Sequence, residues 1–371
     1  MLAEDVLAPL NLPPFHSSAM DGYALRLEDR VPEPGSSLRL VGESLAGHPY
    51  PGRMGNDECI RITTGAALPA CADTVVIQEN CEIFGDRIRL IQVPDRGANI
   101  RLVGHDVRMG DTIGHRGKRL SPLDSGWLAA CGLTDVPVYC LPRVAVFSTG
   151  DELVPPGGRL EEGRIYDANR SVLLALLSRL PVAVTDLGIL PDDTAAIEAA
   201  LTDAAEDHQL LLTSGGVSVG DADYVKDIVE RLGSIELWRI NLKPGKPLAF
   251  GKLARALFLG LPGNPVSTIV TCLLVAKPLL LALAGARPQE PMHFRARLAV
   301  DIPHRPGRTE YQRGICESHG VEIVVRTTGD QSSNRLATFS GANCLIRIPK
   351  EAADLKAGSS VEVLPFEGLI G

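Results

Sequence analysis

Between residues 142 and 286, short apolar runs alternate with stretches whose apolar residues have helical spacing. The apolar runs cover residues 143–150, 182–189, 209–216 and 256–263, and each ends in turn-forming residues. In the segment 169–180, one helical face carries Val172, Leu173, Leu176, Leu177 and Leu180. The segment 192–207 begins with cap-type residues followed by helix formers. Buried-type strands that alternate with helices predict a parallel, doubly wound α/β sheet.

The chain on either side of this region has the composition of β domains. The first 140 residues are rich in Gly and Pro and contain short β-like runs, such as residues 59–66 and 86–93. After about residue 287, "VEIVVRTTG", "NCLIRIP" and "SVEVLPF" indicate a small closed β domain. We therefore expect a multidomain α/β plus β protein. A central doubly wound α/β domain is flanked by a β-rich N-terminal part and a C-terminal β-barrel-like domain.

Charge and cysteine usage narrow the classes of protein. The net charge of −8 argues against a general nucleic-acid or membrane-surface binder, so an anionic ligand must be held by local groups. Eight scattered cysteines without a C-x-x-C pair are typical of reduced thiols in a cytoplasmic protein, and a zinc site is not expected. The apolar run 266–285 contains Lys277 and Pro278, which favours a buried helix over a membrane span.

Three of the expected strands are followed by loops that are unusually rich in glycine, proline and acidic residues. These segments are "STGDEL" (148–153), "TSGGVSVGDADY" (213–224) and "GLPGNP" (260–265). Ligands of open parallel sheets bind outside the carboxyl ends of the strands, and glycine lets backbone N–H groups approach a phosphate closely. The G-G-x-x-x-G spacing at 215–220 matches neither the dinucleotide nor the P-loop motif. Taken alone, that loop is equally well explained as a tight turn in which Asp221 or Asp223 caps a helix.

The carboxylates in these loops would repel an anion unless a cation lies between them. Mg²⁺ prefers oxygen ligands and bridges carboxylates to phosphate oxygens. The segment 238–251 adds Arg239, Lys243 and Lys246 beside prolines and glycine. A solvated basic loop is the alternative for these three side chains, although the rigid neighbours favour a directed role.

Five motifs now carry a resemblance to a known family. "SAMDGYAL" (18–25), "GRIYDANRSVLLALL" (163–177), "TSGGVSVGDADY", "LKPGKPLAFG" and "GLPGNPVST" occur in this order. The set resembles the molybdopterin molybdenumtransferase family, which also includes the E domain of gephyrin. The resemblance implies a linker and dimerisation domain (1–16 and 104–141) and a β-rich inserted domain (17–103). It also implies a molybdopterin-binding α/β domain (142–286), a C-terminal β domain (287–371) and a homodimer.

The resemblance also implies a reaction. Molybdenum from molybdate is inserted into adenylylated molybdopterin, AMP is released, and Mg²⁺ is the cofactor. The implied partners are the enzyme that makes adenylylated molybdopterin and the molybdoenzymes. Two other functions remain alternatives: a gephyrin-like dimeric scaffold that binds a partner peptide, and a nucleotide pyrophosphatase or amidohydrolase on the same fold.

The family's functional residues transfer position by position. The implied catalytic residues are Asp21 (facing the site from the partner subunit), Asp106, Glu152, Asp192, Asp223 and Lys243, with Asp21 and Asp223 as Mg²⁺ ligands. The implied substrate-binding residues are Thr149, Gly150, Ser214, Gly215, Gly216, Val217, Ser218, Arg239, Lys246, Pro262, Gly263, Asn264, Pro265, Arg313 and Ser333. Arg239 stands where the family has lysine, and His16 stands where the family has an acid. Helix capping is an alternative for Asp192, and a surface role is an alternative for Arg313 and Ser333.

Overall fold

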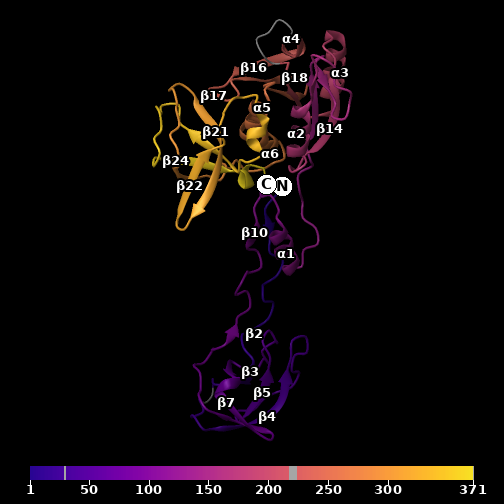
Figure 1. Ribbon diagram of the computed structural model, residues 1–371. Helices are drawn as coiled ribbons and strands as arrows, with labels where there is room; N and C mark the ends of the chain where they lie inside the picture. The colour runs from indigo at the N-terminus through magenta and orange to yellow at the C-terminus, as the bar shows by residue number, and fades with distance from the viewer. Residues whose placement is uncertain (29–30, 217–223, 371) are drawn as a thin grey trace. The chain divides into compact units, whose positions relative to one another are not determined.

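The computed structural model describes residues 1–28, 31–216 and 224–370, apart from the side chain of Trp238. Three predicted site residues, Val217, Ser218 and Asp223, lie outside the described residues. The chain divides into two compact units, drawn together in Figure 1. The N-terminal unit is Leu2–Val138, and the second unit is Met1 with Tyr139–Gly371.

A six-stranded sheet forms the centre of the second unit, in the order β14-β11-β15-β19-β18-β16. Its four parallel strands are β11 (Arg143–Thr149), β14 (Ala183–Leu190), β15 (Leu210–Ser214) and β19 (Ala256–Leu261). They coincide with the four apolar runs, so the prediction of a parallel sheet is confirmed. The sheet continues with two antiparallel strands that were not expected, β18 (Pro247–Leu253) and β16 (Gly233–Arg239).

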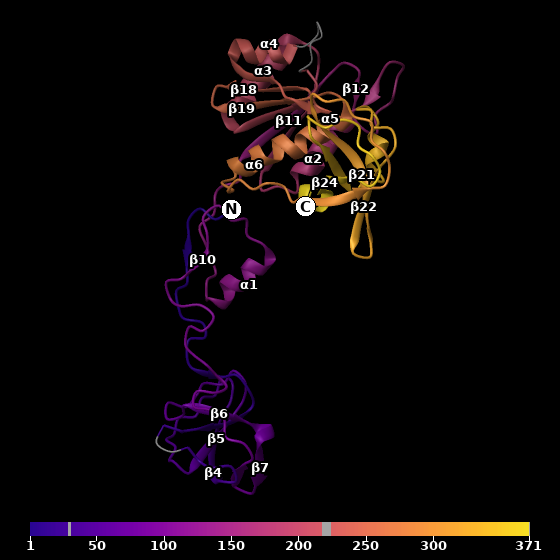
Figure 2. The same ribbon diagram turned by 90° about the vertical axis from the view of Figure 1, so that its left-hand side faces the viewer.

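Helices cover both faces of this sheet, which confirms the doubly wound architecture. On one face, α3 (Thr194–Asp207) and α4 (Tyr224–Leu232) share an apolar core with the strands. On the other face, α2 (Ala168–Leu177) and α6 (Lys277–Leu283) do the same (Figure 2). Leu173 and Leu177, both on the predicted apolar face of α2, are completely buried. A short parallel pair, β12 (Leu153–Val154) and β13 (Ile165–Tyr166), precedes α2.

One long apolar helix connects the sheet to the C-terminal domain. It consists of α5 (Pro265–Thr271), a π-helical turn η2 (Cys272–Ala276) and α6. The ring of Pro278 crowds the carbonyl of residue 274, which gives the widened turn a physical cause. By length and composition the helix could cross a membrane, but 56% of its apolar window is buried inside the protein, as in a core helix.

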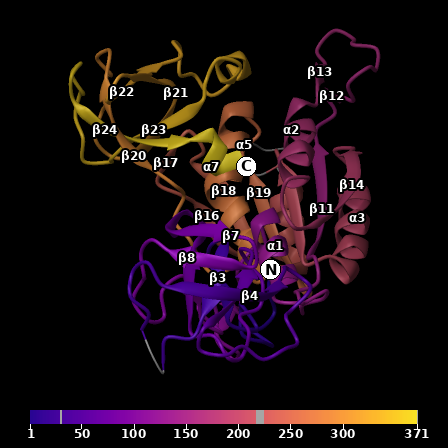
Figure 3. The same ribbon diagram turned by 90° about the horizontal axis from the view of Figure 1, so that it is seen from below.

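The C-terminal domain is a closed β-barrel packed on this long helix. The barrel ring runs β21-β22-β20-β24-β23 and closes through the β21–β23 pairing, while β17 (Leu242–Lys243) adds to β21. The ring strands are β20 (Phe294–Leu298), β21 (Thr309–His319), β22 (Glu322–Thr327), β23 (Cys344–Ile348) and β24 (Ser360–Pro365). Figure 3 shows them with the terminal helix α7 (Phe366–Ile370). Apolar residues of α5, β23, β24 and α7 form one cluster, which joins the barrel to the α/β domain.

The N-terminal unit is rich in short strands, as its composition predicts. Its largest sheet has the order β6-β3-β5-β4-β8-β7, and two further strand pairs are β1-β10 and β2-β9. The helix α1 (Pro122–Ala130) begins with a capping box between Ser121 and Asp124. The strands are β1 (Val6–Leu7), β2 (Ser17–Ser18), β3 (Gly22–Leu25), β4 (Ser37–Ser44), β5 (Glu58–Ile62), β6 (Thr74–Ile77), β7 (Cys81–Phe84), β8 (Arg87–Leu90), β9 (Ile100–Arg101) and β10 (Thr112–Gly114).

All eight cysteine thiols are free, and most of them are at least partly buried. Burial raises the pKa of Cys59, Cys272 and Cys344 to about 12, because desolvation disfavours the thiolate. Cys140 is the exposed thiol of the set. Since the thiolate is the reactive form, the buried thiols are poor nucleophiles and poor metal ligands in the folded protein.

We expect one fast-reacting thiol in the native protein. Ellman's reagent should modify Cys140 promptly at neutral pH, whereas Cys59, Cys272 and Cys344 should react only after unfolding in denaturant. The Cys140→Ser variant should lack the fast phase and keep the slow phases. Fast reaction of the three buried thiols in the folded protein would contradict their burial.

Candidate functional site

The loops that follow β11, β15 and β19 meet at one edge of the sheet. The Gly215 N–H donates to the carbonyl oxygen of Leu261 at 3.1 Å, which joins the second loop to the third strand. A Cβ atom on Gly263 would lie 3.7 Å from the Cα of Gly215, and one on Gly216 would lie 2.8 Å from Oγ1 of Thr149. The structure therefore brings together predicted site residues from the loops after all three strands.

Two consecutive glycines keep the backbone of this edge uncovered. Gly215 and Gly216 have φ angles of 91° and 66°, in the left-handed region that favours glycine. At Gly216 a side chain would also lie 2.6 Å from Cγ2 of Val225. Just before the turn, the buried hydroxyls of Ser148 and Ser214 lie 3.5 Å apart. The turn thus presents backbone rather than side chains to a ligand, as expected for an anion site.

Carboxylates cluster at the adjoining ends of β11 and β14. The Asp151 N–H donates to Oδ2 of Asp192 at 3.1 Å, and the Asp192 N–H donates to Oδ1 of Asp151 at 3.3 Å. The N-cap of α3 is Asp193, whose carboxylate accepts from the Ala196 N–H at 2.7 Å. The helix-capping alternative for Asp192 is therefore wrong, and its carboxylate instead joins the two strand ends.

Glu152 folds back over the turn that follows β11. A Cβ atom on Gly150, whose φ is 140°, would lie 2.4 Å from Oε2 of Glu152. Within the described residues, no group of three His, Cys, Asp or Glu side chains gathers in metal-binding geometry. The Asp151–Asp192 pair still fits Mg²⁺, because this ion commonly takes one or two carboxylates and completes its shell with water and substrate phosphates.

The start of α5 is fixed by partners from two other segments and by a side chain of α5 itself. The Asn169 side chain of α2 donates to the Gly263 carbonyl at 2.7 Å, and the Thr268 hydroxyl donates to the Pro262 carbonyl at 2.6 Å. The Val266 N–H donates to the carbonyl of Ser333 in the barrel at 3.1 Å. Asn264 is the N-cap residue and Pro265 occupies the first helical position, where its missing N–H costs nothing. The predicted segment 262–265 is thus held rigidly beside the glycine turn.

Arg313 is completely buried and organises the loop that contains Ser333. Its guanidinium donates to the carbonyls of Asp330, Gln331 and Ser332 and to the hydroxyl of Thr338, at 3.0 to 3.3 Å. Burial lowers the pKa of Arg313, while the charges of Asp330 and Glu310 oppose that shift. The surface alternative for Arg313 is therefore wrong. Its contacts are all within the barrel, and it reaches α5 through the loop that it holds.

The "KPGKP" segment passes from the sheet into the barrel and back. In the pairing of β17 with β21, Lys243 lies directly opposite Glu310, and its Nζ is 3.0 Å from Oε2 of that buried carboxylate. The turn continues at Gly245, where a Cβ atom would lie 2.5 Å from Cγ2 of Thr271 in α5. Lys246 and Arg239 on either side of this turn are exposed.

Sequence reasoning missed Glu310 and Asn169 as parts of this arrangement, and it placed Asp151 just past a strand without naming it among the site residues. A signal for Glu310 was present: Glu310 and Gln312 alternate on the buried face of β21, where an apolar pattern is expected. The Gln312 amide donates to Oε1 of Glu310 at 3.0 Å, so the buried carboxylate is satisfied on both oxygens. Asn169 lay within a quoted motif, but nothing in its spacing pointed to the Gly263 carbonyl.

Two predicted catalytic acids belong to the N-terminal unit. Oδ1 of Asp21 accepts from the backbone N–H of Thr64 at 2.7 Å and from the Thr64 hydroxyl at 2.8 Å. These bonds, the backbone one first, hold the pKa of Asp21 below its usual range. Asp106 is exposed on a separate loop, where its N–H donates to the Leu12 carbonyl. Their place in one site with the strand-end loops stays a prediction.

Comparisons with known proteins agree with this architecture over the whole chain. Three family descriptions match in succession: MoeA N-terminal region, domains I and II (1–132), probable molybdopterin binding domain (145–282) and MoeA C-terminal region, domain IV (295–366). A molybdopterin molybdenumtransferase of Haemophilus influenzae is 41% identical, over 100% of this chain and 92% of the relative. Gephyrin of Dictyostelium discoideum is 31% identical over 98% of this chain and 57% of its own length. The crystal structure of a molybdopterin biosynthesis MoeA protein from Pyrococcus horikoshii covers 99% of this chain and 92% of its own, with 30% identity and a TM-score of 0.81.

The fold and the family matches therefore define an α/β protein with a domain of the molybdopterin-binding class and a C-terminal barrel. The chain belongs to the molybdopterin molybdenumtransferase family, a family of transferases in molybdenum cofactor biosynthesis. The resemblance of the five motifs is confirmed.

The glycine turn can be tested by adding one methyl group. Gly216→Ala should lower the free energy of unfolding by about 2–4 kcal/mol, because strain at positive φ adds to overpacking against Val225 and Thr149. Gly157→Ala is the matched control: φ is 87° and a Cβ atom would meet nothing within 4 Å, so about 1 kcal/mol is expected. Urea denaturation measures both, and equal losses would contradict the close approach.

The hydrogen bonds to Asp21 predict a pH effect. Thr64→Val removes the hydroxyl bond and keeps the backbone bond, so the pKa of Asp21 should rise toward the ordinary value of about 3.9. Because the folded-state pKa lies below the unfolded one, the stabilisation exists at neutral pH and disappears as the pH falls through the folded-state pKa. An NMR titration of the Asp21 carboxyl checks the direction, with Thr63→Val as the control. An unchanged Asp21 pKa in Thr64→Val would contradict the assignment.

Proposed function

We propose that the chain inserts molybdenum from molybdate into adenylylated molybdopterin and releases AMP. The observation that carries the proposal is the meeting of three glycine-containing strand ends beside the start of α5. Glycine backbone without side chains at the carboxyl edge of a parallel sheet lets the phosphate groups of such a substrate approach closely. The similarity to molybdopterin molybdenumtransferases over the full chain supports the same substrate class.

The charged residues around this edge have distinct proposed roles. Lys243, held in place by Glu310, and the exposed Lys246 and Arg239 supply positive charge to molybdate or to the leaving AMP. Bringing two anions together is unfavourable without such cations. No covalent nucleophile is part of the proposal. Positioning and fixed electrostatics provide the rate acceleration.

Mg²⁺ is the proposed cofactor, and it would act as a Lewis acid on the pyrophosphate. Asp192 and its partner Asp151 are the described carboxylates that fit it best, and Asp21 and Asp223 remain the ligands that the family pattern implies. In a cytoplasmic homodimer, Asp21 would reach the site from the partner subunit. The proposed partners are the enzyme that makes adenylylated molybdopterin and the molybdoenzymes that receive the cofactor.

Neighbouring aspartates provide a matched test of this function. Asp192→Asn keeps an oxygen that can accept from the Asp151 N–H but removes the charge, so molybdenum insertion should fall about a hundredfold. Asp193→Asn should retain activity, because asparagine caps helices as well as aspartate does. The protein is incubated with adenylylated molybdopterin, molybdate and Mg²⁺ while AMP and active cofactor are measured together. If Asp192→Asn inserts molybdenum at the wild-type rate, the metal assignment is wrong.

A dimeric scaffold remains the second candidate, because gephyrin is among the relatives. This function predicts a stoichiometric partner peptide and no turnover. Release of AMP coupled to cofactor formation in the purified protein would exclude a purely structural role.

A further inference from the structure

Asn169 lies at the start of α2 and contacts the loop that precedes α5. Its side-chain nitrogen donates to the Gly263 carbonyl at 2.7 Å. Neither the implied site residues nor the proposed reaction includes this side chain. A Cβ atom on Gly263 would lie 3.7 Å from the Cα of Gly215, so the loop that Asn169 holds lies against the glycine turn. Two successive contacts thus connect Asn169 to that turn.

The first turn of α2 is anchored, which gives Asn169 a fixed position. Asp167 is the N-cap, and its buried carboxylate accepts from the backbone N–H of Arg170 at 3.0 Å and from Nε of the same residue at 2.9 Å. The Arg170 guanidinium also donates to Oδ2 of Asp186 in β14 at 2.5 Å. The beginning of the helix is therefore tied to a strand of the central sheet.

Two consecutive carbonyls of the 262–265 segment are held by protein donors. Asn169 holds the carbonyl of Gly263, and the buried hydroxyl of Thr268 holds that of Pro262 at 2.6 Å. A carbonyl oxygen carries partial negative charge, so an unpaired one beside the phosphate groups of a substrate would repel them. The two donors keep both oxygens engaged within the protein.

The other end of the Asn169 amide indicates that this side chain contributes little to stability. Its Oδ1 is buried and forms no hydrogen bond within the described part of the chain. Turning the amide over would place Oδ1 against the Gly263 carbonyl, which also only accepts, so the donor orientation is fixed. A buried unpaired acceptor costs free energy, and an apolar side chain would avoid that cost. Asn169 thus contributes placement rather than stability.

We infer that Asn169 is a positioning residue for the pterin substrate. It acts through the Gly263 carbonyl, which keeps the 262–265 segment in place against the glycine turn. The identity of the substrate, adenylylated molybdopterin, rests on the proposed function. Without Asn169, the Gly263 carbonyl is released near the phosphate groups and the segment loosens. Both changes weaken binding of the substrate.

Equilibrium binding tests Asn169 without requiring turnover. Adenylylated molybdopterin is titrated anaerobically into the full-length protein, without molybdate, and binding is followed by calorimetry. Asn169→Ala should weaken binding about tenfold, the effect of one lost hydrogen bond. Asn169→Asp should weaken it more, because a carboxylate cannot donate to the Gly263 carbonyl and adds a negative charge near the anion. Ser171→Ala is the matched control, because the Ser171 hydroxyl donates to the Asp167 carbonyl within the same helical turn.

Thermal unfolding separates positioning from a structural role. Asn169 occupies the second position of α2, where the helix dipole favours a negative charge, so Asn169→Asp should keep the wild-type Tm or raise it slightly. Asn169→Ala loses one hydrogen bond but also removes the unpaired Oδ1, and water can reach the exposed Gly263, so its Tm should change little. A reduced affinity at an unchanged Tm is the result expected for a positioning residue.

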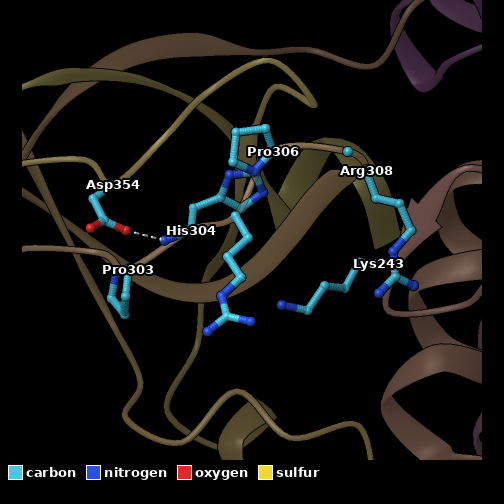
Figure 4. A pocket seen from close by; sticks show the side chains of 8 residues that line it. Lys243, Pro303, His304, Pro306, Arg308 and Asp354 are labelled. Carbon is cyan, nitrogen blue, oxygen red and sulfur yellow. Dashed lines mark hydrogen bonds between the residues drawn. The ribbon is translucent and has the colours of Figure 1, made fainter.

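Steady-state kinetics show which substrate depends on Asn169. In Asn169→Ala, the KM for adenylylated molybdopterin should rise about tenfold, and the KM for molybdate should stay unchanged. Molybdate is a suitable internal control because Lys243, one of the cations proposed to act on the anions, lines a cavity of about 710 Å³ on the barrel (Figure 4). The rest of that lining comes from the segment 303–308 and from Asp354, which belong to the barrel.

Three results would overturn the inference. They are wild-type affinity in both Asn169 variants, an equal loss of affinity in Ser171→Ala, or a loss of affinity that only accompanies a lowered Tm. Molybdenum insertion with an unchanged KM for adenylylated molybdopterin in Asn169→Ala would contradict the positioning role and leave the proposed function standing. The expected binding pattern without AMP release by the wild type would contradict the proposed function and leave Asn169 as a positioning residue.

Discussion

The start of helix α5 is the point on which the geometry of the site depends. The Val266 N–H in its first turn donates to the carbonyl of Ser333 in the barrel. Thr271, at the other end of α5, packs closely against Gly245 of the "KPGKP" turn. The loop before the helix is tied to α2 through Asn169. Because a single rigid helix contacts all of these segments, the strand-end loops and the basic turn keep fixed positions relative to one another.

Two buried charges in the barrel serve that geometry. Arg313 and Glu310 sit on the same strand, and both side chains are almost fully removed from water. Such charges cost several kcal/mol of desolvation each, which hydrogen bonds and partner charges offset only when the geometry is good. Here each charge has several partners, and each one fixes a functional segment: Arg313 fixes the 330–333 loop, and Glu310 fixes Lys243. Specific placement, rather than stability, is what these groups contribute.

The sequence predicted the architecture well because periodicity reports burial directly. The parallel strands and the α2 face followed from apolar spacing, and the barrel strands β22, β23 and β24 followed from β-type runs. The antiparallel edge strand β16 and its neighbour β18 were missed, because "GSIELWR" carries two charged residues and lies beside Pro and Gly signals. Cap geometry was not predictable either: two adjacent aspartates fit an N-cap equally well in the sequence, and the structure makes Asp193 the N-cap, where its carboxylate accepts from the Ala196 N–H. Long-range partners such as Asn169 and Gly263 are 94 positions apart and leave no local pattern.

The shared strand β17 has an evolutionary consequence. It contributes two residues to the barrel, although the segments before and after it belong to the α/β sheet. An α/β domain excised after α6 would retain Lys243 but lose the carboxylate and the backbone partner that orient it. The freed side chain would recover up to about 2 kcal/mol of rotamer entropy, and it would no longer point in one direction. Selection on that lysine therefore acts on both modules at once, and neither can be exchanged for a foreign domain without rebuilding the other.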